Sequence, residues 1–146
     1  MEIRRAAVIG AGTMGSGIAA HLANAGVPVM LLDIVPEGAD SRNAVAEGAI
    51  ARMLKADPAP FMSKSAANLV TPGNVEDDLK RLGDCDWIIE AVLEQPELKR
   101  DLYARLEAVK RPDAIVSSNT STIPLRDLVD GRTVAFRSRF LITHFF

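Results

Sequence analysis

Apolar residues follow two patterns along this chain. Short continuous runs, typical of strands buried on both faces of a sheet, lie at 5–9, 29–32, 87–92, 114–117 and 140–143. Helical spacing or composition predicts helices between these runs, at 13–25, 41–56, 61–69, 76–82 and 124–129, with a further helix from Pro96 and a brief edge strand at 70–74. Strands alternating with helices predict an α/β fold: a Rossmann-type doubly wound, mostly parallel sheet with helices on both faces.

The first predicted helix carries its apolar residues at helical spacing. Met14, Ile18, Leu22 and Ala25 fall on one face, and we expect that face to pack on the sheet. On the helix that begins at Pro96, the corresponding residues are Leu98, Leu102, Leu106 and Val109.

A glycine-rich turn joins the first strand to the first helix. Gly10 permits a tight turn, Gly12 lets the backbone approach a pyrophosphate, and Gly15 allows the helix to pack closely. Thr13 and Met14 begin the helix, whose free N–H groups and positive dipole end attract phosphate. Together with the flanking strands, this turn predicts a dinucleotide site, although a tight turn in an ordinary α/β domain is the alternative.

The second strand ends in Asp33, about 20 residues beyond the glycine turn. A carboxylate at this place accepts hydrogen bonds from ribose hydroxyls and repels a 2′-phosphate. The residues that follow, 34–36, supply no arginine to receive such a phosphate. The cofactor predicted here is therefore NAD rather than NADP, with FAD as the alternative that shares the glycine pattern.

Composition limits the class of protein. The 146 residues are enough for one domain, and 48% hydrophobic with 25% charged residues is ordinary for a globular protein. A net charge of −2 provides no basic surface for nucleic acid or an anionic membrane, and no apolar run is long enough to span a bilayer. The single cysteine, Cys85, excludes an internal disulfide and is typical of a cytoplasmic protein.

Polar residues follow several of the predicted strands, at the edge where ligands bind in parallel sheets. They are 90–94, the Ser-Asn-Thr-Ser sequence at 118–121, and His144. The serine-rich loop can bind a substrate oxygen, or it can satisfy its own backbone and cap the next helix. Likewise, His144 can be a packed core residue or a general base beside a nicotinamide.

These pieces resemble the N-terminal domain of the L-3-hydroxyacyl-CoA dehydrogenases, which act in fatty-acid β-oxidation. The matching segments are 8–19, 90–94 with Leu98-Lys99, 118–121, and the His-Phe-Phe sequence at 144–146. They occur in the family's order over essentially the whole chain. The glycine pattern alone is common to many dehydrogenases, whereas the last two segments together are much more specific.

The resemblance implies roles for individual residues. His144 matches the catalytic histidine, Ser121 the serine that hydrogen-bonds the substrate oxygen, and Asn119 a residue that lines the nicotinamide and substrate site. Glu94 and Lys99 match positions that contact the cofactor near the nicotinamide ribose, with a solvated helix start as the alternative. His144 would take the proton of the 3-hydroxyl of a 3-hydroxyacyl-CoA as hydride passes to NAD, and no metal is needed.

The sequence also departs from this family. The glutamate that orients the histidine and an asparagine are both expected beyond Phe146, as is the helical domain that closes the acyl pocket and mediates dimerisation. The apolar run at 140–146 stops without a polar tail. We therefore expect residues 1–146 to be a truncated NAD-binding domain of a multidomain or homo-oligomeric parent, with little turnover alone.

Two other functions remain open at this point. One is a related NAD-dependent hydroxyacid or sugar-acid dehydrogenase, against which Asn119 favours the acyl-CoA substrate. The other is a non-catalytic NAD-binding module. Ser121 and His144 argue against the module, because a sensor has no need of a base.

Overall fold

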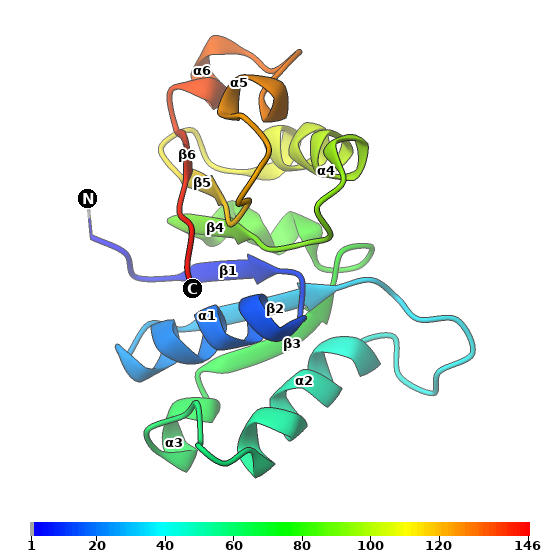
Figure 1. The fold of residues 1–146 in the computed structure, drawn as a ribbon, viewed down its shortest axis with the longest axis vertical. Coiled ribbons are helices and arrows are strands. Elements are labelled where there is room, and N and C mark those ends of the chain that lie inside the picture. The colour runs from blue at the N-terminus through cyan, green and yellow to red at the C-terminus, as the bar shows by residue number, and fades with distance from the viewer. Residues whose placement is uncertain (1) are drawn as a thin grey trace.

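The computed structural model describes residues 2–146 and contains a six-stranded sheet in the order β3-β2-β1-β4-β5-β6 (Figure 1). Each pair of neighbouring strands runs parallel. The strands are β1 (Ala6–Ile9), β2 (Val29–Asp33), β3 (Val70–Asn74), β4 (Trp87–Glu90), β5 (Ile115–Ser118) and β6 (Phe140–Ile142). The predicted Rossmann-type sheet is confirmed, and the strand order reverses between β1 and β4, where such folds bind their ligands.

Helices cover both faces of the sheet. They are α1 (Thr13–Asn24), α2 (Ala44–Lys55), α3 (Lys64–Ala67), the 3₁₀ helix η1 (Leu79–Asp84), α4 (Pro96–Val109), α5 (Leu125–Leu128) and α6 (Val134–Arg137). Because side chains alternate along a strand, β1 places Val8 in the core beneath α1, α2 and α3 and Ile9 in the core beneath η1, α4, α5 and α6.

Some predicted elements are shorter than expected or shifted. The helix predicted at 61–69 is reduced to α3, where the Ser63 side chain accepts a hydrogen bond from the Ala66 N–H. The segment predicted at 76–82 forms the 3₁₀ helix η1 instead, which begins at Leu79, three residues later than predicted. The α6 helix was not predicted, because in its four residues only Phe136 is buried.

The prediction for the inner face of α1 is half right. Ile18 and Leu22 are buried against the sheet, whereas Met14 is 38% exposed and Ala25 is also exposed. Small residues at 15, 16, 19, 20 and 23 fill the remaining contact with the sheet. Met14 therefore faces away from the core, at the end of the helix that meets the glycine turn.

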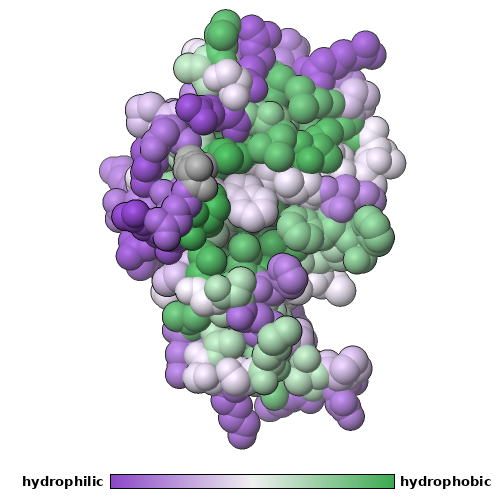
Figure 2. Space-filling model, turned by 90° about the vertical axis from the view of Figure 1, so that its left-hand side faces the viewer, coloured by the Kyte–Doolittle hydropathy of each residue, from purple (hydrophilic) through white to green (hydrophobic). Residues whose placement is uncertain are grey.

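Exposed apolar residues gather near the last strand. Figure 2 views the molecule from the side on which β6 lies and shows hydrophobic surface at its upper right and centre, beside a hydrophilic left side. In this region of the chain, Leu141 and Ile142 are 39% and 37% exposed, and Phe146 is fully exposed. No helix in residues 2–146 combines the length and apolar character that crossing a membrane requires.

Candidate functional site

Backbone hydrogen bonds join the carboxyl ends of neighbouring strands. The Gly10 N–H donates to the Leu32 carbonyl at 2.8 Å, and the Ala91 N–H donates to that of Ile9 at 2.8 Å. Further along the same edge, the Asn119 N–H donates to the Glu90 carbonyl at 2.8 Å. These bonds continue the parallel ladder into the loops, so segments far apart in the sequence are held side by side.

The glycine turn has the geometry that its sequence predicts. Gly10 has φ +105°, and a Cβ there would lie 2.4 Å from the Ala91 carbonyl oxygen. A Cβ on Gly15 would lie 1.7 Å from the Gly10 oxygen, so only glycine allows α1 to begin this close to the turn. Around Gly12, by contrast, nothing lies within 4 Å of the Cβ position.

The amino end of α1 is open toward this space. Gly12 is its N-cap residue, and no side chain of the described residues caps the helix there. The first N–H groups of a helix have no partner within the helix, and its dipole places partial positive charge at that end. Thr13 and Met14, both exposed, therefore begin a helix that is suited to a phosphate group.

Asp33 lies beside the glycine turn at the end of β2. Its Oδ2 accepts from the Ala11 N–H at 2.5 Å, and its Oδ1 accepts from the Ile34 N–H at 2.7 Å. The side chain is half-buried, so part of the carboxylate is available to a ligand. Asp33 thus braces the turn, and its contact with ribose hydroxyls remains a prediction.

A cavity of about 300 Å³ opens between the glycine turn and α4. Gly12 and Asp33 line one part of it, and mostly apolar side chains form its walls: Ile34, Val75, Val92, Leu93, Leu98 and Leu102, together with Asp101 and Arg105. A slot of this kind is suited to a flat aromatic base, because apolar walls bury the ring faces.

The contribution of α4 to this cavity was not predicted from the sequence. Leu98, Asp101, Leu102 and Arg105 follow the i, i+3, i+4, i+7 spacing of one helix face, which is the signal that identifies them. The Arg105 guanidinium is fixed by the Val75 carbonyl oxygen at 2.7 Å and the Glu76 carboxylate at 3.3 Å. Val75 was likewise missed, because it follows β3 within a turn.

The serine-rich loop after β5 presents some residues outward and buries others. Ser118 and Thr120 are buried, Asn119 is half-buried, and Ser121 is exposed. The Asn119 Oδ1 accepts from the Phe145 N–H at 2.8 Å, so this amide joins the loop to the final segment of the chain.

His144 is exposed and lies between two residues that are tied to this loop. The Thr143 N–H donates to the Ser118 carbonyl at 3.0 Å, and the Phe145 N–H donates to Asn119. The alternative of a packed core histidine is therefore wrong. Among residues 2–146, no carboxylate forms an ion pair or hydrogen bond with the His144 imidazole, whose ring centre lies 6.0 Å from that of Phe146.

Glu94 joins the start of α4 to the serine-rich loop. Its Oε1 accepts from the Thr120 hydroxyl, from the Ser121 N–H at 3.2 Å and from the Thr122 N–H at 3.3 Å. Burial raises the pKa of this carboxyl, but the hydrogen bond from Thr120 and the charge of Lys99 outweigh that effect and lower the pKa to about 2.

Lys99 is directed into the protein, with 1% of its side chain exposed. Its Nζ donates to the Glu90 Oε1 at 2.6 Å and lies 3.3 Å from the Glu94 Oε2. A solvated helix start is therefore wrong for this residue. Its predicted contact with the cofactor stays a prediction, because both of these partners are carboxylates of the protein.

Glu90 is a buried acid whose role was not predicted from the sequence. Besides Lys99, it accepts from the Tyr103 hydroxyl at 2.5 Å, the Ser118 hydroxyl at 2.6 Å and the Val92 N–H at 2.8 Å. Burial, followed by the negative charge of Glu90, raises the pKa of Tyr103 above its ordinary value. Tyr103 was missed, although it follows Lys99 by one helical turn.

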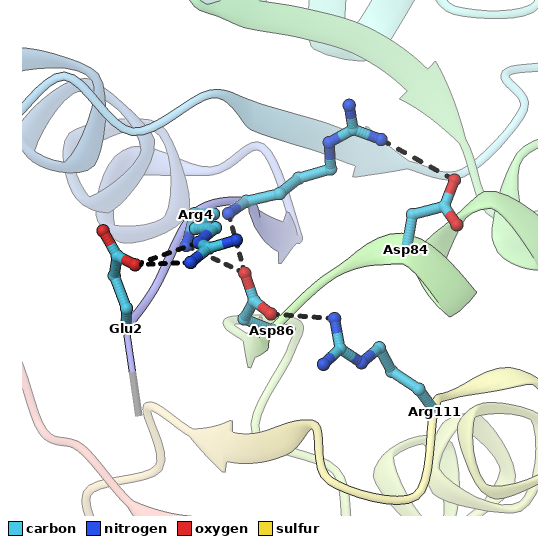
Figure 3. A pocket seen from close by; sticks show the side chains of 6 residues that line it. Glu2, Arg4, Asp84, Asp86 and Arg111 are labelled. Atoms are coloured by element: carbon cyan, nitrogen blue, oxygen red, sulfur yellow. Dashed lines mark hydrogen bonds and ion pairs between the residues drawn. The ribbon is translucent and has the colours of Figure 1, made fainter.

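A second cavity, of about 410 Å³, lies at the amino ends of the strands, opposite the proposed ligand site (Figure 3). Its charged groups pair with one another. Asp86 accepts from the N–H groups of Arg4 and Arg5 at 2.8 Å and 3.0 Å, and it receives the Arg111 guanidinium at 2.9 Å. This cluster ties the segment before β1 to the amino ends of β4 and β5.

Two further features bear on chemistry. Burial raises the pKa of Cys85 to about 11, so its thiol stays protonated near neutral pH. Within residues 2–146, no three His, Cys, Asp or Glu side chains are grouped as metal ligands.

Comparisons with known proteins agree on one family. Residues 5–146 match the family described as "3-hydroxyacyl-CoA dehydrogenase, NAD binding domain". A Deinococcus radiodurans protein named "Probable 3-hydroxyacyl-CoA dehydrogenase" is 51% identical over 146 residues, which are 100% of this chain and 42% of the relative. A Bacillus subtilis protein of the same name is 44% identical over 159 residues, covering 99% of this chain and 20% of the relative.

A solved structure supports the same relationship. The Escherichia coli 3-hydroxybutyryl-CoA dehydrogenase superposes with a TM-score of 0.79 at 29% sequence identity, over 100% of this chain and 30% of that one. The chain therefore spans less than half the length of these curated relatives and of this structural neighbour.

Proposed function

The chain belongs to the 3-hydroxyacyl-CoA dehydrogenase family as an NAD-binding domain, and we propose that it supplies the cofactor site and the catalytic base for oxidising a (S)-3-hydroxyacyl-CoA to the 3-oxoacyl-CoA in fatty-acid β-oxidation. NAD is the cofactor of this family of domains. Because the relatives are longer, the whole reaction is proposed for a multidomain or homo-oligomeric protein of which this chain is one part. A cytoplasmic location likewise stays a prediction.

The placement of His144 carries this proposal. Hydrogen bonds from the residues on either side of it, Thr143 and Phe145, hold it against the serine-rich loop and leave its ring exposed. The carboxyl ends of β5 and β6 thus present an imidazole beside the loop that contains Ser121. A histidine and a hydroxyl at such an edge are suited to handling the proton of an alcohol.

The residues at the glycine turn fit NAD. The open space at Gly12 and the uncapped start of α1 would receive the pyrophosphate, and Asp33 would receive the adenine ribose. The apolar cavity that Ile34 and Val75 line would take the adenine ring. When bound, NAD supplies the acceptor for a hydride.

The residues of the chain have separate tasks in the proposed reaction. His144 would accept the proton of the 3-hydroxyl group, and bound NAD would accept the hydride that leaves C3 of the substrate. Ser121 presents an exposed hydroxyl to the substrate oxygen. The Asn119 Oδ1 accepts from the Phe145 N–H at 2.8 Å, so this amide ties the serine-rich loop to the segment that contains His144.

Turnover by these 146 residues alone is expected to be low. A histidine that becomes positively charged in the reaction requires a carboxylate to orient and stabilise it. Within residues 2–146, His144 has no carboxylate in hydrogen-bonding contact. Binding of the cofactor is therefore the first property to test.

The cofactor site is tested by calorimetric titration of the chain with NAD and NADP. NAD should bind more tightly than NADP, because Asp33 repels a 2′-phosphate. Asp33→Ala should weaken NAD binding about tenfold or more, since it removes both the ribose contact and the brace on the Ala11 N–H. A folded chain that binds neither nucleotide would contradict the proposal.

The catalytic base is tested in a chimera in which this chain replaces the matching segment of the D. radiodurans relative. Oxidation of 3-hydroxybutyryl-CoA should fall about 10²- to 10⁴-fold in His144→Ala. The matched control is His21→Ala, an exposed histidine on α1 that should leave the rate unchanged. Equal rates for the two variants would exclude His144 as the base.

A further inference from the structure

We infer that Glu90 is a positioning residue of the cofactor site, closing a ring of hydrogen bonds that sets the serine-rich loop and the Glu94 carboxylate for the nicotinamide half of NAD. The inference rests on the proposed function, because the ring acts on binding only if that half of the cofactor lies at this loop.

The ring passes through residues at the ends of β4 and β5 and the start of α4. Lys99 Nζ donates to Glu90 Oε1 at 2.6 Å and lies 3.3 Å from Glu94 Oε2. Glu94 Oε1 accepts from the Thr120 hydroxyl, and the Thr120 N–H donates to the Ser118 Oγ at 3.2 Å. The Ser118 hydroxyl donates to Glu90 Oε2 at 2.6 Å and completes the ring.

Glu90 is the only fully buried carboxylate of this ring, with no exposed surface, whereas Glu94 is 38% exposed. A buried carboxylate is tolerated only when donors satisfy it. Both Glu90 oxygens are satisfied, by Lys99 and the Val92 N–H on Oε1 and by Tyr103 and Ser118 on Oε2. Because Lys99 and Ser118 bind different oxygens of Glu90, the bonds of the ring themselves fix the orientation of this carboxylate.

The same residue also holds the loop through its backbone. The Glu90 carbonyl accepts from the Asn119 N–H at 2.8 Å. On the outer side of the ring, Glu94 receives the N–H groups of Ser121 and Thr122. The predicted substrate ligands Asn119 and Ser121 are therefore both placed by groups that depend on Glu90.

Replacing Glu90 by glutamine would break a hydrogen bond of the ring while keeping the size and shape of the side chain. The amide presents an NH₂ group where the carboxylate has an oxygen, so one donor would face either Lys99 or the hydroxyls of Tyr103 and Ser118. The buried Lys99 would also lose its closest countercharge.

The two halves of the cofactor site allow a local effect to be separated from a general one. The adenine half is proposed at Asp33 and the apolar cavity, and none of the ring residues line that cavity. ADP probes this half alone, whereas NAD probes both. A positioning role therefore predicts a loss of NAD binding that ADP does not share.

The experiment is calorimetric titration of the 146-residue chain with NAD and with ADP. In Glu90→Gln and in Ser118→Ala, which opens the ring at another bond, NAD affinity should fall about tenfold while ADP affinity changes by less than about twofold. Tyr103→Phe is the matched control. It removes a hydrogen bond to Glu90 from outside the ring, so it should lower the melting temperature but preserve the ratio of NAD to ADP affinity.

The outcomes separate the inference from the proposed function. If NAD and ADP affinities fall together in both ring variants, or if neither falls, Glu90 is merely structural and the inference is overturned. If Glu90→Gln does not fold, the ratio of NAD to ADP affinity in Ser118→Ala alone tests the inference. A folded wild-type chain that binds neither ligand would overturn the proposed function, and the inference with it.

Discussion

Gly15 and Gly17 lie in the same helix but differ in their surroundings. A Cβ on Gly15 would lie 1.7 Å from the Gly10 carbonyl oxygen, whereas nothing lies within 4 Å of the corresponding position on Gly17. Gly15→Ala must displace backbone, so we expect it to destabilise the fold by about 3 kcal/mol or more and to abolish NAD binding. Urea unfolding and NAD titration measure the two effects.

The matched control is Gly17→Ala. Alanine is the better helix former, so this change should stabilise the chain by about 0.5–1 kcal/mol and preserve NAD binding. Equal destabilisation by the two substitutions would show that the close approach of α1 to the glycine turn is not what requires Gly15.

Glu94 makes stability depend on pH in acid. Its folded pKa lies at about 2, below its ordinary value of 4.5. The carboxylate therefore contributes stability that is present above about pH 4.5 and is lost as the pH falls toward 2. Because the side chain is 38% exposed, solvent screening limits the contribution to about 1 kcal/mol.

Glu94→Gln should therefore be less stable than the wild type at pH 7, by about 1 kcal/mol, and should approach it as the pH falls below 4. Urea unfolding at several pH values measures this difference. The control is Glu97→Gln, which replaces an exposed carboxyl in the first turn of the same helix. The difference in its free energy of unfolding from the wild type should not depend on pH. A constant gap between Glu94→Gln and wild type at all pH values would contradict this assignment.

Residue types alone predicted the glycine turn and Asp33, but not the buried cluster around Glu90. The glycines and Asp33 were found because each has a backbone or charge requirement that few residues meet. Glu90 and Tyr103 were not found as a pair, because a buried acid within an apolar run reveals its partners only when α4 is packed over the strand. Lys99 was expected at a solvated or ligand-facing position for the same reason.

At the scale of elements, α6 depends on a cap rather than on an apolar face. The Thr133 Oγ1 accepts from the Phe136 N–H at 3.2 Å and donates to the Glu107 carboxylate at 2.6 Å. We expect Thr133→Ala to lower the free energy of unfolding by about 1 kcal/mol. Thermal or urea unfolding measures the loss.

Ser138→Ala serves as the control for the cap. Ser138 is exposed, and its hydroxyl donates only to the Ala135 carbonyl within the described residues. Its replacement should change stability by less than about 0.5 kcal/mol. A similar loss in both variants would mean that Thr133 contributes no more than an ordinary surface hydroxyl.

The elements that the sequence predicted well are those with many apolar residues. The strands predicted at 5–9 and 29–32 correspond to β1 and β2, because a continuous apolar run has few alternatives in a parallel sheet. The short elements were harder. η1 and α6 bury few side chains each, so their local pattern is weak and packing against α4 and the sheet decides their form.

At the scale of the whole molecule, the parallel topology predicts that ligands bind at the carboxyl ends of the strands. Parallel strands bring their carboxyl ends together, and this placed the glycine turn, the serine-rich loop and His144 on one side before any contact was known. The cavity wall from α4 was not predicted, because helix packing angles are set by the tertiary structure. Pattern and topology thus predict the candidate site, and packing adds the cavity wall that α4 forms.

Binding at the proposed site should stabilise the whole domain, because NAD would contact loops that follow several strands, and these separate on unfolding. At a concentration of 100 times its Kd, NAD should add about 2.7 kcal/mol, which is about 8–10 °C in melting temperature for a domain of this size. The shift is measured by differential scanning fluorimetry. It should persist in Gly17→Ala and shrink in Asp33→Ala at the same NAD concentration, because the Asp33 carboxylate accepts from the Ala11 N–H in the glycine turn and is the predicted ribose ligand. An equal shift in Asp33→Ala and wild type would place the cofactor away from β2.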